Sequence, residues 1–238
     1  MRFGVQHSVG DPAWTTEILA PDAVAEFARV AETRGFDLIA FTDHPAPSAA
    51  WVEGGGEGVA DPFSALGFCA AVTSRVRLLT FVLVAAYRNP FLAAHQVATL
   101  DALSGGRLTV GLGTGYLFGE FRALGADPAA RRQEFDERVA LMRRAWSGET
   151  ISVETPDFVA RATRVLPRGP AASPAVVDSR QQPLWAEACG AVRRGMARHD
   201  DARQRGDRAH DAHDAIARHS RAPPEDRRGA HGGDGGRT

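Results

Sequence analysis

The residues best suited to chemistry are Asp43 and His44, an adjacent pair that follows an apolar stretch of the chain. A histidine titrates near neutrality and can therefore give or take a proton, and a neighbouring carboxylate can fix its tautomer. The alternative is structural, because Asp43 also lies just ahead of Pro45, where an aspartate often only forms a turn. The place of the pair at the end of an expected strand favours catalysis, with His44 as acid or base and Asp43 orienting it.

A second candidate is the glycine-rich run of residues 111–115, which contains Gly113, Thr114 and Gly115. Glycine in a strand often marks only close packing or a bulge. The functional alternative is that the missing side chains let a flat ring or a phosphate lie against the backbone, where Thr114 offers a hydroxyl. Arg88 leaves two interpretations equally open, an ion pair with an anion or a packing role. A metal site built from His7, Asp43 and His44 lacks the paired histidine ligands expected on a first strand, so no metal is predicted.

The elements that must position these residues alternate between strand and helix. Strands are expected at residues 2–7, 36–42, 76–84 and 107–113, and helices at 21–34, 62–73, 90–104 and 128–147. Asp or Asn followed by Pro opens three of these helices, at residues 61, 89 and 127; the side chain caps an unpaired amide and the proline presets the helical dihedral. The strand at 76–84 is apolar nearly throughout, as in a parallel sheet covered on both faces.

Four βα units imply either a doubly wound sheet or the first part of a barrel. His7, Asp43, His44, Arg88 and Tyr116 all lie at the ends of expected strands or just after them, so they would gather at one face. No glycine fingerprint for a dinucleotide follows the first strand. The prediction is an α/β fold of the (βα)8 TIM-barrel type, incomplete, with about five βα units. Residues 1–167 would form the barrel domain, 168–205 a degraded fifth strand and helix, and 206–238 a disordered tail rich in Arg, Asp, His and Gly.

Composition excludes several classes of protein. The net charge is -1 and hydrophobic residues make up 44%, which fits neither a disordered chain nor a nucleic-acid binder. All 28 basic residues are Arg, so a Schiff-base lysine is excluded. Two cysteines are too few for a disulfide framework, and no apolar run is long enough to span a membrane. These features predict a cytoplasmic protein without a membrane or nucleic-acid partner.

Three longer segments resemble the bacterial luciferase-like monooxygenase family, in particular its coenzyme F420-dependent oxidoreductases. They read AETRGFDLIAFTDH, then TSRVRLLTFVLVAAYRNPFLAAHQVATLDALSGGRLTVGLGTGY, then EFRALGADPAARRQEFDERVALMRRAWSGE, and they fall within residues 1–150. The LDxLSGGR segment from Leu100 to Arg107, followed by VGLGTG, is a hallmark of the family.

The resemblance implies a barrel whose C-terminal mouth holds coenzyme F420 or, alternatively, FMN, with His44 acting beside the ring. The third strand of the family contains a bulge, in some members with a non-proline cis peptide, that presses on the ring; here it would lie between Phe81 and Val84, so that Val82 and Val84 join Gly113, Thr114, Gly115 and Tyr116 as expected cofactor contacts. Sugar-phosphate dehydrogenases of this branch have a glutamate where this chain has Tyr116, which disfavours that substrate.

The resemblance weakens after residue 150. The family's fifth strand is echoed by residues 182–185 and its helix by residues 191–205, after which Arg, Asp, His and Gly dominate. Two functions therefore compete. The first is an oxidoreductase that transfers a hydride between reduced cofactor and a small organic substrate, expected to be a homodimer. The alternative is a catalytically silent, truncated barrel fragment from a frameshifted gene.

Overall fold

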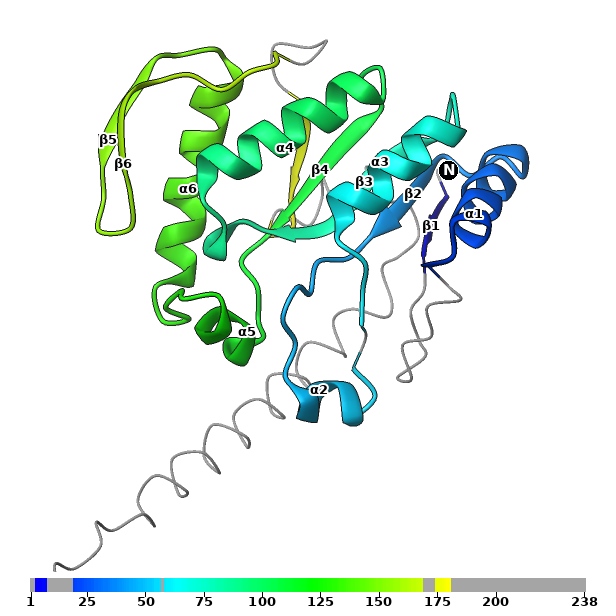
Figure 1. Cartoon of the computed structure of the whole chain (residues 1–238), viewed down its shortest axis with the longest axis horizontal. Helices are drawn as coiled ribbons and strands as arrows, with labels where there is room; N and C mark the ends of the chain where they lie inside the picture. The colour runs from blue at the N-terminus through cyan, green and yellow to red at the C-terminus, as the bar shows by residue number, and fades with distance from the viewer. Residues whose placement is uncertain (1–2, 8–18, 57, 169–173, 181–238) are drawn as a thin grey trace, which may run out of the picture.

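The computed structural model describes residues 3–7, 19–56, 58–168 and 174–180. Their centre is a parallel five-stranded sheet in the order β1-β2-β3-β4-β7 (Figure 1). The strands are β1 (Gly4–Gln6), β2 (Leu38–Phe41), β3 (Arg77–Val84), β4 (Leu108–Gly113) and β7 (Ala175–Asp178). Neighbours along the chain pair with one another from β1 to β4, which is the arrangement expected of successive βα units. The predicted α/β class with a parallel sheet is confirmed.

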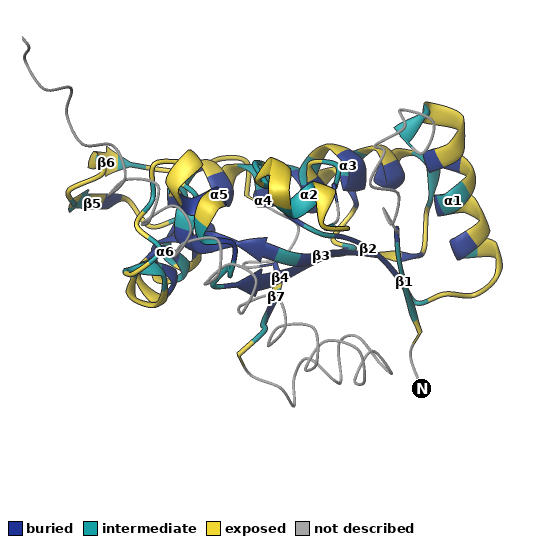
Figure 2. Cartoon of the chain, turned by 90° about the horizontal axis from the view of Figure 1, so that it is seen from below, coloured by how far each residue is buried: buried dark blue, intermediate teal, exposed yellow. Residues whose placement is uncertain are grey.

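Helices α1 (Pro21–Thr33), α3 (Pro62–Val72) and α4 (Pro90–Leu103) cover one face of this sheet (Figure 2). A fourth long helix, α6 (Arg131–Trp146), packs against α4. The main core fills the layer between sheet and helices, with Phe41, Leu78 and Leu112 from the strands and Val97 from α4 fully buried. Residues of β3 are buried on both faces of the sheet, because Leu78 and Leu83 belong to this core and Leu79 and Phe81 to a second, smaller cluster. This explains why β3 reads as an almost unbroken apolar run.

Two of the three predicted helix caps are present in the structure. The Asp61 side chain accepts from Ser64 N at 2.7 Å, and the Asn89 side chain accepts from Phe91 N at 3.0 Å, so both caps are confirmed. The third prediction is wrong, because α6 begins at Arg131 and not at residue 128. The Asp127 carboxylate instead accepts from Ala129 N at 2.8 Å, a bond that closes a local turn before the helix begins.

The LSGGR segment has a structural explanation in Arg107. Its guanidinium donates to the carbonyl oxygens of Ala70, Thr73 and Val76 and to the Thr73 hydroxyl, over 2.9–3.2 Å. Carbonyls at the C-terminus of a helix lack intrahelical partners, so this one side chain satisfies the end of α3 and joins it to the start of β4. Gly105 and Gly106 adopt positive φ of 67° and 82°, which lets the chain turn tightly ahead of it.

Beyond α6 the chain differs from expectation. An antiparallel hairpin of β5 (Ile151–Glu154) and β6 (Val159–Thr163), which was not predicted, follows that helix. The fifth strand of the parallel sheet is β7, which pairs with β4 and lies earlier in the sequence than the expected strand at 182–185. That segment, the expected helix at 191–205 and the expected tail at 206–238 lie outside the described residues. Among the described residues, no helix has the length and apolar character needed to cross a membrane.

Candidate active site

The carboxyl ends of β2, β3 and β4 bring the predicted residues to one edge of the sheet. Asp43 and His44 follow β2, Arg88 follows β3 after the short 3-10 helix η2 (Ala85–Tyr87), and Tyr116 follows β4. The short helices α2 (Ala49–Glu53) and α5 (Phe118–Ala123) lie at this same end of the molecule (Figure 1). Parallel strands place their C-terminal loops together, which is where enzymes of this architecture carry their sites.

His7, which follows β1, is packed rather than presented to the site. Its ring stacks on Phe41 with centroids 4.9 Å apart and meets the edge of Phe27 at the same distance. Only 7% of the residue is exposed. This packing between two aromatic rings gives His7 a structural role.

Asp43 is buried and ties the end of β2 to the end of β3. Its carboxylate accepts from Val84 N at 2.9 Å, from the Tyr87 hydroxyl at 3.3 Å and from Arg88 Nη2 at 2.5 Å. Burial raises the pKa of Asp43, while the charge and hydrogen bonds of Arg88 act in the opposite direction. Burial and the adjacent carboxylate raise the pKa of Tyr87, so the phenol keeps its proton and donates a hydrogen bond to Asp43. Arg88 therefore neutralises a carboxylate of the protein itself.

His44 has a hydrogen-bonding partner at each ring nitrogen. Its Nδ1 lies 3.3 Å from Glu120 Oε2, and its Nε2 lies 3.1 Å from the Tyr116 hydroxyl. The carboxylate that meets the histidine ring is thus Glu120, whereas the bonds of Asp43 go to β3 and Arg88. Side-chain exposure is 9% for His44 and 2% for Glu120, so the pair is shielded from solvent.

A short stretch of backbone explains how Glu120 reaches His44. Gly115 adopts a φ of 76°, a conformation that favours glycine, and turns the chain sharply after β4. Three residues later α5 begins and places Glu120 in its first turn, next to the loop that follows β2. There Glu120 Oε1 accepts from Ala46 N at 3.1 Å, which fixes the carboxylate on both sides.

The two glycines are required by packing. A Cβ on Gly113 would collide with the Val82 side chain, and a Cβ on Gly115 would lie 2.7 Å from both Val84 and Phe121. Val84 is only 4% exposed and belongs to the core, whereas Val82 keeps exposed surface. The expected bulge is confirmed, since the β3–β4 register shifts between Thr80 and Leu83 and the Phe81–Val82 peptide is cis.

Sequence reasoning missed two members of the site. Glu120 is a lone acid among Tyr116, Leu117, Phe118 and Phe121, and a single charge in such an apolar run is a signal of a buried, partnered carboxylate. Trp51 of α2 forms a wall beside the histidine, with ring centroids 6.3 Å from His44 and 6.0 Å from Tyr116. No local pattern predicts that contact.

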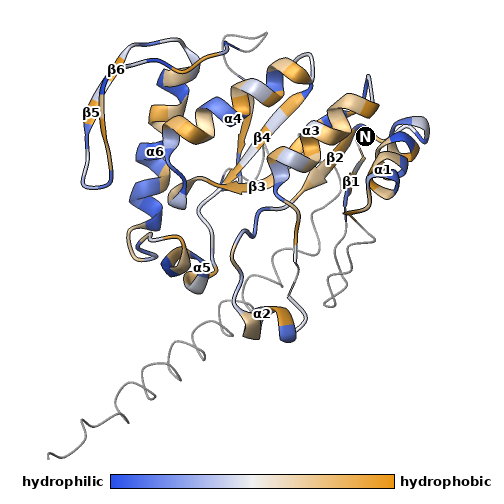
Figure 3. Ribbon diagram, viewed as in Figure 1, coloured by the Kyte–Doolittle hydropathy of each residue, from blue (hydrophilic) through white to orange (hydrophobic). Residues whose placement is uncertain are grey.

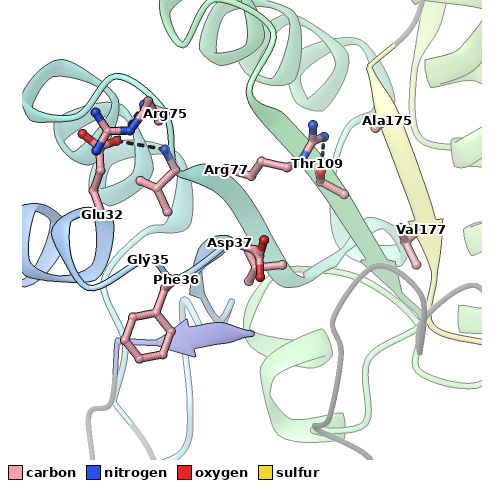
Figure 4. A pocket seen from close by; sticks show the side chains of 11 residues that line it. Glu32, Gly35, Phe36, Asp37, Arg75, Arg77, Thr109, Ala175 and Val177 are labelled. Atoms are coloured by element: carbon pink, nitrogen blue, oxygen red, sulfur yellow. Dashed lines mark hydrogen bonds between the residues drawn. The ribbon is translucent and has the colours of Figure 1, made fainter. Parts of the chain in front are cut away.

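A pocket of about 560 Å³ lies at the opposite end of the sheet (Figure 4). Residues from the starts of the strands line it, among them Leu38, Arg77, Thr109 and Ala175. Arg77 donates to the Thr109 hydroxyl at 2.7 Å, so its guanidinium is engaged within the sheet. The N-terminal end of such a sheet contributes to stability, and the chemistry gathers at the other end.

The residues at the carboxyl ends fit a flat ring. Val82 presents apolar surface on a bulge beside Gly113, which has no side chain, and Thr114 is half-buried next to it. His44, Trp51 and Tyr116 supply polar and aromatic groups from the neighbouring loops. Apolar support with a few convergent polar groups is the usual composition of a cofactor site.

Comparison with known proteins shows which family shares this sequence and fold. Residues 1–199 match the luciferase-like monooxygenase family. An F420-dependent glucose-6-phosphate dehydrogenase from Beutenbergia cavernae is 34% identical over 158 residues, which cover 65% of this chain and 46% of that protein.

Two solved structures share the fold. The monooxygenase RslO1 from Streptomyces bottropensis superposes with a TM-score of 0.66 at 30% identity, over 79% of this chain and 56% of RslO1. The oxygenating constituent of 3,6-diketocamphane monooxygenase from Pseudomonas putida, a complex with FMN, superposes with a TM-score of 0.64 at 16% identity, over 75% and 51% of the two chains. The chain thus spans about half the length of these proteins. Its sheet is of the luciferase-like TIM-barrel type, and the chain belongs to the luciferase-like monooxygenase family.

Proposed function

We propose that this chain is an oxidoreductase that uses coenzyme F420, or alternatively FMN, to transfer a hydride to or from a small organic substrate. The observation that carries the proposal is His44, held through both ring nitrogens at the strand ends of a luciferase-like sheet. The F420 dependence of the glucose-6-phosphate dehydrogenase relative favours F420. Tyr116 stands where that enzyme class is expected to have a glutamate, which argues for a different substrate.

When bound, such a cofactor supplies the hydride exchange. The protein's own residues support and orient it: Val82, Gly113 and Thr114 form the surface for the ring. His44 holds the proton that accompanies the hydride. Asp43 secures the loop that carries His44, because its bonds to Val84 and Arg88 lock the ends of β2 and β3 together. Of the two valines expected to contact the ring, we propose Val82, which keeps exposed surface, and not Val84, which is buried.

The test is direct binding of each ring. The purified protein is mixed with F420 or with FMN, passed through a sizing column and examined for ring absorbance that co-elutes with protein. We expect retention of F420. Val82→Asp places a charge against the ring and should abolish retention, whereas Val159→Asp, on the exposed strand β6, is the matched control. If neither F420 nor FMN co-elutes with the wild-type protein, the proposal is refuted and a catalytically silent remnant is favoured.

We also propose that the protein forms a homodimer and works in the cytoplasm. Support for the dimer comes from α3 and α4, which expose Phe68, Leu92 and Leu103. Support for a reducing compartment comes from Cys69, which is buried as a free thiol.

A further inference from the structure

The contacts of His44 define where its proton sits. Glu120 Oε2 faces Nδ1, and the other oxygen of Glu120 already accepts from Ala46 N. A carboxylate can only accept hydrogen bonds, so the ring nitrogen opposite it must carry the proton. In the neutral imidazole, Nε2 is then left with a lone pair.

That lone pair points at Tyr116. The Tyr116 hydroxyl lies 3.1 Å from His44 Nε2, and with Nε2 as acceptor the phenol must be the donor. Tyr116 is half-buried, while the His44 side chain is 9% exposed and Glu120 2%. The three side chains therefore form a line from the interior outwards in the order Glu120, His44, Tyr116, with the phenol outermost.

We infer that Tyr116 is the group that exchanges a proton with substrate, that His44 is the base behind it, and that Glu120 is the positioning residue that sets the direction of the relay. The arrangement is that of a catalytic triad, in which a buried carboxylate fixes the tautomer of a histidine and the histidine takes the proton of a hydroxyl. The inference rests on the proposed function and specifies it: the reacting group of the substrate is an alcohol, or the carbonyl that results from its oxidation.

The chemical step balances. As the alcohol is oxidised, its O–H bond breaks and the proton passes to the Tyr116 oxygen, while the phenolic proton of Tyr116 moves to His44 Nε2. The adjacent C–H bond breaks with its electron pair as the carbonyl double bond forms, and the oxidised deazaflavin or flavin, when bound, would supply the acceptor for that hydride. Glu120 stabilises the imidazolium through Nδ1. Reduction of a carbonyl runs the same transfers in reverse.

The decisive test reads the His44 tautomer and needs neither cofactor nor substrate. Protein labelled with ¹⁵N-histidine is studied by NMR at a pH about two units above the ordinary histidine pKa of ~6.5, and His44→Ala assigns the signals. We expect the Nδ1–H tautomer in the wild type. In Glu120→Gln the Ala46 amide still needs an acceptor, so the new side chain must turn its NH₂ group towards Nδ1 and force the Nε2–H tautomer.

Glu149→Gln, which changes an exposed glutamate paired with Arg144, is the matched control and should leave the tautomer unchanged. Wild-type protein with the Nε2–H form would overturn the inference without any variant. An unchanged tautomer in folded Glu120→Gln protein would overturn the role of Glu120.

The second arm tests Tyr116 with F420 and 2-propanol, the smallest secondary alcohol. Tyr116→Phe should lower kcat at least about a hundredfold, the usual worth of a general acid or base, with little change in F420 affinity and with the Nδ1–H tautomer kept. Binding of F420 with no turnover of 2-propanol by the wild type would overturn the alcohol assignment, and full activity of Tyr116→Phe would overturn the relay. Failure of F420 and FMN to bind, with the expected tautomer, would instead count against the proposed function alone.

Discussion

At the scale of single residues, sequence spacing predicted where polar groups gather but not which of them touch. Asp43 and His44 are neighbours in sequence, and pairing them was the natural hypothesis. In the fold, adjacent residues at a strand end point in different directions, so Asp43 reaches Val84 and Arg88 while His44 meets Glu120, 76 residues away. Contacts of such separation depend on the turn at Gly115, which no local pattern specifies.

His44→Ala should abolish turnover and leave cofactor affinity nearly intact. A group that handles a proton contributes mainly in the transition state, so its removal lowers kcat far more than binding. Steady-state kinetics combined with a cofactor titration separates the two effects. His95→Ala, which removes a histidine of α4 bonded to the Leu166 carbonyl, serves as control. Equal loss of affinity and turnover would contradict the assigned role.

The Asp43–Arg88 pair predicts a strong asymmetry in stability. Asp43→Asn removes the charge that compensates a largely buried guanidinium, and leaving one partner of a buried pair costs about 3–5 kcal/mol. Replacing both partners by apolar residues, as in Asp43→Leu with Arg88→Met, should cost less than the single change. Urea unfolding of Asp43→Leu, Arg88→Met and the double variant, each compared with the wild type, measures this double-mutant cycle. Additive losses would show that the two side chains are not energetically coupled.

At the scale of elements, the parallel strands and the helices covering them followed from apolar runs and capping residues, because both are local signals. The hairpin β5–β6 was missed although residues 151–163 carry β-branched residues on both sides of Thr155-Pro156-Asp157, a turn sequence. The start of α6 was misplaced because Asp127 followed by Pro128 has the same composition in a turn as in a helix cap.

Glu32 joins two elements and gives a prediction with a definite pH dependence. The carboxylate, at the end of α1, accepts from the backbone N–H groups of Ser74, Arg75 and Val76 ahead of β3, and these bonds lower its pKa to about 2. A depressed pKa contributes stability above the unfolded value of 4.5 that is lost as the pH falls towards 2.

Glu32→Gln should therefore destabilise the fold by about 1–2 kcal/mol at neutral pH, with the difference from wild type shrinking between pH 4.5 and pH 2. Chemical denaturation at a series of pH values checks the trend. Glu26→Gln, an exposed change on the same helix, should show no such dependence. A difference that is constant with pH would mean that the charge of Glu32 is not involved.

At the scale of the whole molecule, a barrel and a doubly wound sheet would both gather the four polar strand ends at one face, and the missing dinucleotide fingerprint after the first strand favoured the barrel. The position of the fifth strand was not predictable, since β7 is a run of only four residues, Ala175–Asp178, whose register is set by pairing with β4. A strand that short carries too little apolar periodicity to be distinguished from its neighbours in the sequence.

The outer surface of the helical layer gives the last prediction. Helix α3 contains no charged residue and α4 only the buried Asp101, and both are apolar around much of their circumference (Figure 3). Helices of that kind are normally covered, yet Phe68, Leu92 and Leu103 are 39%, 58% and 72% exposed. A second copy meets such a face without bringing like charges together, which suits the self-complementary interface of a two-fold dimer.

Leu92→Glu should weaken the proposed dimer, because it places a charge on the exposed α3–α4 face of each copy. We expect the dimer Kd to rise at least about tenfold, equivalent to about 1.4 kcal/mol. Light scattering across a dilution series measures the change. Val159→Glu adds the same charge at an equally exposed apolar position on β6 and should leave the Kd unaltered, because the hairpin is a separate element from the α3–α4 face. Equal effects of both substitutions on the Kd would show that added charge, and not this face, controls association. A wild-type protein that stays monomeric at all concentrations would exclude the dimer.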